Sequence, residues 1–120
     1  MTQVSALPFD VRPGEVQKNL HVVLNALESL PDAVQLLLLP EKWPTSFLPT
    51  FSDDLRRQSE EALRVVHEAA LKKDLVVVGS APGGEGKKPF NEIHFLGIAG
   101  SHRPYRKRLL FSPTGEGRQV

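Results

Sequence analysis

The stretch that most constrains the fold is residues 33–41, AVQLLLLPE, in which four consecutive leucines precede a proline and a glutamate. A short apolar run bounded by turn-forming residues is typical of a buried strand in an α/β protein, covered on both of its faces. Pro40 has no backbone N–H to donate to a strand ladder, so the strand should end there. Glu41 would then stand at the carboxyl end of a buried strand, where open α/β sheets place their functional residues. The alternative is that Glu41 is a solvated loop residue.

Patterns on either side of this run predict alternating strands and helices. Strands are expected at residues 3–7, at the leucine run, at 75–78 and at 90–96. One helix is expected to open at residues 10–15, DVRPGE, and to end before Pro31, with Pro13 near its first turn and Glu15 placed against the positive end of the helix dipole. A second helix is expected between residues 52 and 73, with Ser52 as N-cap. The apolar positions at helical spacing should face the core: Val16, Leu20, Val23, Leu24, Leu27 and Leu30, then Leu55, Ala62, Leu63, Val66 and Ala70. This β-α-β-α-β order predicts a layered α/β fold with right-handed crossovers.

Length and composition exclude several classes of protein. A chain of 120 residues forms at most one domain, and a net charge of +1 argues against a protein dedicated to nucleic acid or to a membrane surface. The start of the sequence does not resemble a signal peptide, and no apolar run approaches the roughly 20 residues that span a bilayer. We therefore expect a cytoplasmic protein with no nucleic-acid or membrane partner. The absence of cysteine excludes disulfides, thiolate metal sites and a thiol nucleophile within these residues.

Two segments suggest ligand sites without matching one. Residues 79–88, GSAPGGEGKK, resemble a phosphate-binding loop, but Ala81 stands where that loop needs glycine, and Lys88 where it needs a hydroxyl. No nucleotide cofactor is expected, and this segment is better explained as a hairpin between two strands. Residues 102–111, HRPYRKRLLF, mix cations with aromatics, which fits nucleic-acid binding, a cation serving a buried site, or a solvated strand edge.

The four histidines give no sign of a metal site. His21, His67, His94 and His102 are scattered at spacings that suit no known arrangement of ligands, and two of them lie on predicted helices beside apolar positions. Helix packing explains those two adequately. No metal is expected.

Four separated segments, in the order LLLLPEKWPTSF, VVVGS, PFNE and YRKRLLFSPTGE, resemble the motifs of the carbon–nitrogen hydrolase (nitrilase) superfamily. The resemblance extends from Val4 to the last residue. It implies an α/β fold that forms the N-terminal half of an α-β-β-α sandwich. It also implies hydrolysis of a small amide or nitrile by a glutamate, a lysine and a cysteine, often with a second glutamate.

The resemblance assigns roles to residues of this chain. It makes Glu41 the general base, Lys107 the catalytic lysine and Glu116 the second glutamate, which would hold the lysine charged and correctly aimed. Asn91 matches a commonly kept asparagine with a structural role. These residue types suit the chemistry, because a thiol needs a base to take its proton and the negative charge that grows on the substrate needs a fixed cation. The base can then hand its proton to the leaving ammonia or amine.

The chain also departs from the family pattern. Its 120 residues amount to about half of a family domain and contain no cysteine, while Leu109, Ser46 and Pro8 replace residues that the family usually has. We therefore expect residues 1–120 to be one truncated hydrolase domain, inactive alone, that self-associates or binds a complementary C-terminal half. The alternative is a non-catalytic interaction module that keeps the first half of the fold.

Overall fold

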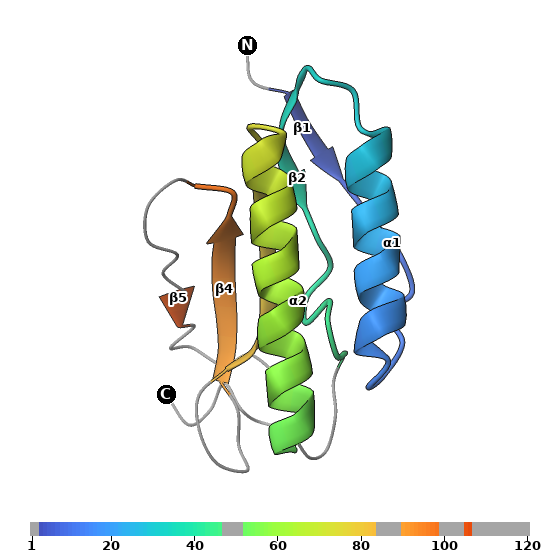
Figure 1. The fold of residues 1–120 in the computed structure, drawn as a ribbon, viewed down its shortest axis with the longest axis vertical. Coiled ribbons are helices and arrows are strands. Elements are labelled where there is room, and N and C mark those ends of the chain that lie inside the picture. Colours follow the sequence, from blue (N-terminus) through green and yellow to red (C-terminus); the bar gives the residue numbers. More distant parts are fainter. Residues whose placement is uncertain (1–2, 47–51, 84–89, 99–104, 107–120) are drawn as a thin grey trace, which may run out of the picture.

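The computed structural model describes residues 3–46, 52–83, 90–98 and 105–106. Within these ranges the chain forms two layers, a five-stranded sheet and a pair of helices (Figure 1). The elements follow one another as β1 (Gln3–Ala6), α1 (Val16–Ser29), β2 (Val34–Leu38), α2 (Asp53–Lys72), β3 (Val76–Gly83), β4 (Phe90–Leu96) and β5 (Tyr105–Arg106). The predicted order of strands and helices is confirmed.

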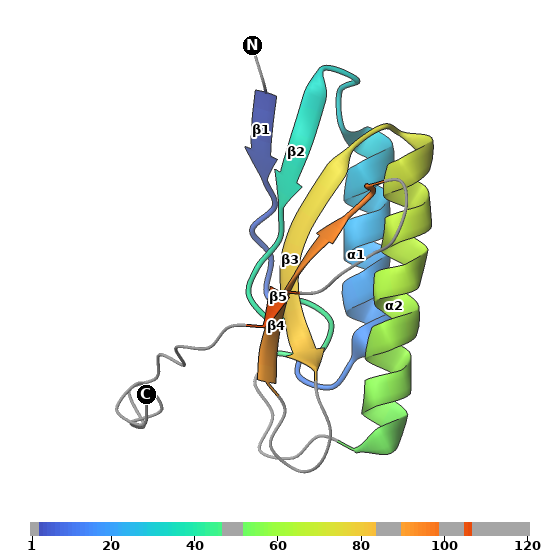
Figure 2. The same cartoon turned by 90° about the vertical axis from the view of Figure 1, so that its left-hand side faces the viewer.

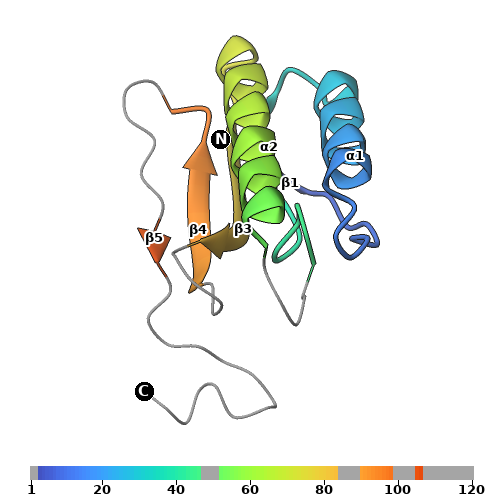
Figure 3. The ribbon, with the colours of Figure 1, turned by 60° about the horizontal axis from the view of Figure 1, so that its bottom comes forward.

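The strands lie in the sheet in the same order as in the sequence. β1, β2 and β3 are parallel, whereas β4 and β5 are antiparallel to their neighbours. Both crossover helices cover the same face of the sheet (Figure 2), as expected when two crossovers of the same hand advance in the same direction. β5 lies at the far end of the sheet from β1 and α1 (Figure 3).

The hydrophobic core fills the space between the helix pair and one face of the sheet. The predicted helix faces are confirmed, although the core only partly buries Leu24, Leu30 and Leu55. Ser52 caps α2 as predicted, since its Oγ accepts a hydrogen bond from the Leu55 N–H at 3.1 Å. The core residues that are at most 2% exposed are Val16, Val23, Leu27, Leu37, Trp43, Ala62, Val66, Ala70, Val77, Ala81 and Leu96.

The structure defines the start of the first helix more closely and contradicts the predicted bounds of the third strand. α1 begins at Val16, and Pro13 and Gly14 form the turn before it, where Gly14 takes a φ of 71° that favours glycine. β3 extends past Val78 to Gly83, so the first half of the predicted hairpin segment is strand. Residues 79–83 pair one by one with residues 94–90 of β4, and this ladder holds the glycine-rich segment extended.

The leucine strand is covered on one face only, not on two as predicted. Leu37 faces the helices and is 1% exposed, whereas its neighbour Leu38 is 40% exposed on the other face. The register aligns Ala6, Leu38, Val78 and Phe95 in one row across four strands of that second face. We call this surface the open face. Its apolar members, by strand alternation, are Val4, Ala6, Leu36, Leu38, Val76, Val78, Ile93 and Phe95.

Gly79, in the VVVGS motif, makes room for the indole of Trp43. A Cβ placed on Gly79 would stand 2.7 Å from Trp43 Cδ1, closer than non-bonded carbon atoms approach. Trp43 is fully buried and follows Glu41 by two residues. The glycine in β3 therefore determines how the turn after the leucine strand packs on the sheet.

We expect Gly79→Ala to destabilise the fold by about 1–3 kcal/mol, because the added methyl group overpacks the Trp43 site. Urea unfolding followed by circular dichroism measures this change. Emission of Trp43, the single tryptophan, should shift to longer wavelength as the indole moves toward solvent. The control Glu60→Ala, on the exposed side of α2, should change stability by less than about 0.5 kcal/mol. Native stability and unshifted emission for Gly79→Ala would contradict this packing argument.

Candidate functional site

Glu41 lies in a turn at the carboxyl end of β2, as the sequence predicts. The Leu39 N–H still donates to the Val78 carbonyl at 2.8 Å, and Pro40 then ends the ladder. Glu41 itself is exposed, whereas Trp43 and Pro44 behind it are buried. The turn thus presents one acidic side chain while its following residues are anchored in the core.

Ser80 holds this turn from the β3 side. Its Oγ accepts a hydrogen bond from the Lys42 N–H at 2.8 Å, and its carbonyl accepts one from the Trp43 N–H at 3.2 Å. Lys42 has a φ of 52°, a left-handed conformation that is uncommon for residues other than glycine. The two bonds to Ser80 therefore stabilise an unfavourable backbone geometry directly after Glu41.

Asn19 in α1 holds the same turn from the opposite side. Its Nδ2 donates to the Pro44 carbonyl at 2.8 Å and to the Arg12 carbonyl at 2.9 Å, and its Oδ1 accepts from the Arg12 N–H at 2.9 Å. A further bond joins the Gly14 N–H to the Thr45 carbonyl at 2.9 Å. Asn19 is only 1% exposed, so its buried amide has a partner at each end.

Neither Ser80 nor Asn19 was singled out by sequence reasoning. The available signal for Asn19 was an amide on the apolar side of a helix, three residues after Val16 and next to Leu20. Such a residue is satisfied only by partners from elsewhere in the chain, and the sequence does not say which. Ser80 belongs to the VVVGS segment quoted above, but nothing in that segment indicates that its serine would hold a turn.

Asn91 makes direct contact with Glu41. Its Nδ2 donates to Glu41 Oε1 at 2.6 Å, across 50 positions of sequence. Asn91 is 8% exposed and pairs with Pro82 in the β3–β4 ladder. Its Oδ1 is buried and has no hydrogen-bond partner among the residues described here. The asparagine for which only a structural role was expected therefore touches the predicted base.

A depression of about 360 Å³ opens beside Glu41 on the open face. Its apolar walls come from Leu38, Leu39, Val78 and Ile93, and its polar atoms from Glu41, Ser80 and Asn91. A small molecule with an apolar body and an amide end would meet complementary groups there. The carboxylate can accept a proton, while the hydroxyl and the carboxamide can donate hydrogen bonds.

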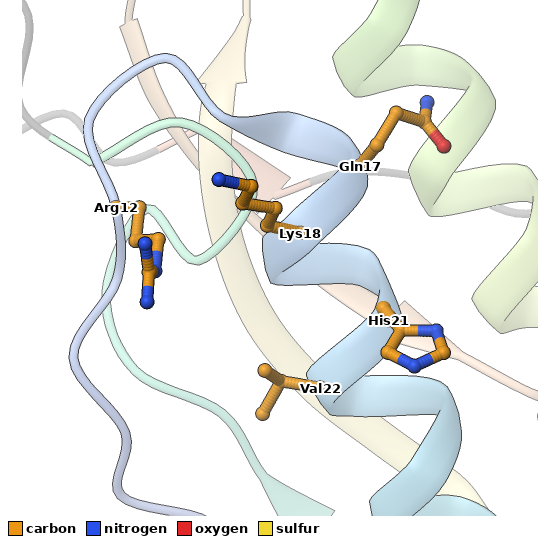
Figure 4. A pocket seen from close by; sticks show the side chains of 5 residues that line it. All are labelled: Arg12, Gln17, Lys18, His21 and Val22. Atoms are coloured by element: carbon orange, nitrogen blue, oxygen red, sulfur yellow. The ribbon is translucent and has the colours of Figure 1, made fainter.

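A larger depression of about 610 Å³ lies at the start of α1, lined by Arg12, Gln17, Lys18, His21 and Val22 (Figure 4). Glu15 already interacts with the basic side chains there, at 2.9 Å from the Lys18 ammonium and 3.9 Å from the Arg12 guanidinium. The hydrogen bond from Lys18 lowers the pKa of Glu15. Gln17 and His21 extend to the side of the helix away from Arg12 (Figure 4). Because Lys18 and Arg12 are already paired with Glu15, we assign no function to this depression.

Lys107 and Glu116 lie outside the described residues, as does most of the basic segment at 102–111. Within that segment, Tyr105 pairs with Ile93, and Arg106 pairs with Glu92. The structure therefore places only Glu41 of the three predicted catalytic residues.

Two features are absent from the described part of the chain. It contains no group of three or more histidine, aspartate or glutamate side chains suited to bind a metal ion. None of its helices is long and apolar enough to cross a membrane.

The sequence matches no protein-family model, and a search of curated proteins finds no match. Among solved structures, the amidase from Nesterenkonia sp. aligns with a TM-score of 0.71 at 23% identity, over 98% of this chain and 46% of the amidase. A cysteine-to-alanine variant of that nitrilase-superfamily amidase gives a TM-score of 0.75 at 22% identity, over 98% and 46%. The complex with butyramide gives 0.71 at 23% identity, over 99% and 47%.

This chain has the fold of half a nitrilase-superfamily amidase. It spans about half the length of the amidases that it matches. The predicted fold class, half of a nitrilase-type α-β-β-α sandwich, is confirmed. In other structures of the Nesterenkonia amidase, the acetamide moiety of fluoroacetamide or an acrylamide molecule is attached to the active-site cysteine.

We expect Asn19→Ala to lower the free energy of unfolding by about 1–3 kcal/mol, because the carbonyl of Pro44 loses its buried partner. Asn25→Ala is the matched control, since it removes an exposed asparagine from the same helix. Denaturant unfolding of the two variants measures the difference. Equal stabilities would show that the hydrogen bonds of Asn19 do not hold the turn.

Proposed function

We propose that this chain is the N-terminal, base-bearing half of an amidase-type carbon–nitrogen hydrolase of the nitrilase superfamily. The observation that carries the proposal is the position of the Glu41 carboxylate. It lies at the carboxyl end of β2, at the edge of a small pocket, and accepts a hydrogen bond from buried Asn91. The fold shared with amidases gives this carboxylate a chemical context, because catalysis in that superfamily needs a base beside a thiol.

The reaction then proceeds as in other thiol-dependent hydrolases. A cysteine contributed by polypeptide outside residues 1–120 attacks the amide carbon while Glu41 takes the thiol proton. The carbon–nitrogen bond breaks, Glu41 gives that proton to the leaving ammonia, and an acyl-thioester remains. Water, activated by the same carboxylate, hydrolyses the thioester and restores the thiol.

Lys107 is proposed as the cation that stabilises negative charge on the substrate oxygen. Lys107 directly follows Tyr105 and Arg106 in the sequence, and these two residues pair with Ile93 and Glu92 of β4. Glu116 is proposed to keep the Lys107 ammonium charged and aimed.

The proposed substrate is a small linear amide or nitrile. A cysteine-to-alanine variant of the Nesterenkonia amidase binds butyramide, and a double variant of it binds acrylamide. The pocket beside Glu41, about 360 Å³ with four apolar side chains in its wall, suits molecules of that size and polarity.

The open face is proposed to be the contact surface for the second half of the enzyme. Val4, Leu38 and Phe95 are 56%, 40% and 44% exposed there, although all three belong to strands. In an α-β-β-α sandwich, the sheet of one half stacks on the sheet of the other, about 10 Å away. Without the second half, the same apolar surface would bind a second copy of this chain.

The catalytic proposal is tested by measuring ammonia release from butyramide. We expect none from the purified 120-residue chain, which has no thiol. We expect release after co-expression with a cysteine-bearing C-terminal half from a neighbouring reading frame. In that assembly, Glu41→Gln should reduce kcat at least about 100-fold, because it removes the proton acceptor. The control Glu28→Gln, on the exposed side of α1, should leave kcat unchanged.

Two results would count against the proposal. Retained turnover in Glu41→Gln would remove Glu41 from the mechanism. Absence of ammonia release from a folded wild-type assembly would favour the non-catalytic interaction module.

The interface proposal is tested with two matched leucines. Leu38 on the open face and Leu71 on α2 are 40% and 39% exposed, but they lie on opposite layers. We expect the isolated chain to elute from size exclusion as a dimer or larger species. Leu38→Lys should shift the chain to monomer, whereas Leu71→Lys should not. A stable wild-type monomer, or equal effects of both variants, would contradict the proposal.

A further inference from the structure

The Glu41 side chain depends on Asn91 for its orientation. The backbone of the turn is held by Ser80 and Asn19, but those bonds end at main-chain atoms of Lys42, Trp43 and Pro44. An exposed glutamate with a free carboxylate would rotate among several rotamers. Among the residues described here, the carboxylate has one hydrogen bond, from Asn91 Nδ2 to Oε1 at 2.6 Å.

Asn91 itself is a buried strand residue. It sits inside β4, pairs with Pro82 across the ladder, and is 8% exposed. A buried strand residue holds its side chain in place more firmly than a loop residue does, so its carboxamide can fix a partner on a turn. A carboxylate only accepts hydrogen bonds, so the end of the carboxamide that faces Glu41 must be its NH₂ group.

We propose that Asn91 is a positioning residue that occupies Oε1 of Glu41 and leaves Oε2 as the oxygen that exchanges the proton. The inference rests on the proposed function, in which Glu41 is the base. One oxygen is then committed to a fixed donor, while the other stays available at the pocket. The carboxylate acts from one orientation, and this preorganisation is what proximity effects in catalysis require.

The other end of the same amide has no partner among the described residues. Asn91 Oδ1 is buried there without a donor, and a buried carbonyl oxygen left without a donor is costly. Within the described part of the chain, the carboxamide of Asn91 is therefore committed to Glu41.

The first test uses the isolated 120-residue chain and needs no activity. The side-chain NH₂ resonances of Asn91 are assigned by comparison with Asn91→Leu in a ¹⁵N-correlated spectrum. In wild type, one of the two protons should lie downfield and move upfield in Glu41→Gln, because the charged acceptor is lost. Identical Asn91 resonances in wild type and Glu41→Gln would overturn the inference, whatever the function of the protein.

The second test uses the enzyme assembled with its cysteine-bearing half. Asn91→Leu should reduce kcat about 10- to 100-fold with little change in KM, because the base is misplaced while the pocket remains. Asn91→Asp should be weaker still at neutral pH, where two carboxylates face each other. It should regain activity as the pH falls, because a protonated aspartate can again donate to Glu41. Asn91→Leu should show no such recovery. If Asn91 had only a structural role, the two variants would not differ in the pH dependence of their activity.

The matched control is Gln58→Leu, which removes the same type of bond at the surface of α2, Gln58 Nε2 to Asp54 Oδ2 at 2.7 Å. It should leave kcat and its pH profile unchanged. If the wild-type assembly releases ammonia but Asn91→Leu keeps native kcat and pH profile, the positioning role fails and the proposed function stands. If the wild-type assembly is inactive, the proposed function fails and the resonance test alone decides whether Asn91 holds the carboxylate.

Discussion

Residues 42–45 contain no helix or strand, and several of their backbone groups find hydrogen-bond partners in other elements. These partners lie on both sides of the turn: Ser80 in β3 on one side, and Asn19 and Gly14 around the start of α1 on the other. The indole of Trp43 packs against Gly79 of β3, where a side chain would otherwise stand. Every feature of the candidate site depends on this anchored turn, because it fixes the Cα of Glu41 above the carboxyl end of the leucine strand.

The sheet determines on which side of the molecule the candidate site opens. Both helices lie on one face, and the apolar residues of the other face alternate with the core residues along the same strands. The pocket beside Glu41 opens on that uncovered face. The surface proposed to receive the second half of the enzyme and the proposed site of chemistry are therefore continuous. In this arrangement, completing the sandwich would also bring the thiol to the base.

In the proposed mechanism, this chain supplies the base and the second half of the enzyme supplies the thiol. A carboxylate without a thiol cannot carry out the proposed acyl transfer, but it can be oriented in advance by residues of its own half. The hydrogen bond that Asn91 donates from β4 is proposed to do this. A preformed base requires less reorganisation when the nucleophile arrives.

The sequence by itself determined the order of the elements, the buried faces of both helices, the Ser52 cap and the end of β2 at Pro40. These features follow from periodicity and from residues near one another in the chain, which act whatever the rest of the molecule does. It also placed Glu41 at the end of β2, and the family resemblance suggested its role. The tertiary structure alone decided that the leucine strand has one uncovered face, that β3 runs on to Gly83, and that Asn19, Ser80 and Asn91 surround the turn. These contacts join residues 25, 38 and 50 positions apart, and no local pattern specifies a partner at such distances. A buried amide or hydroxyl must be satisfied, but only the folded chain determines by which group.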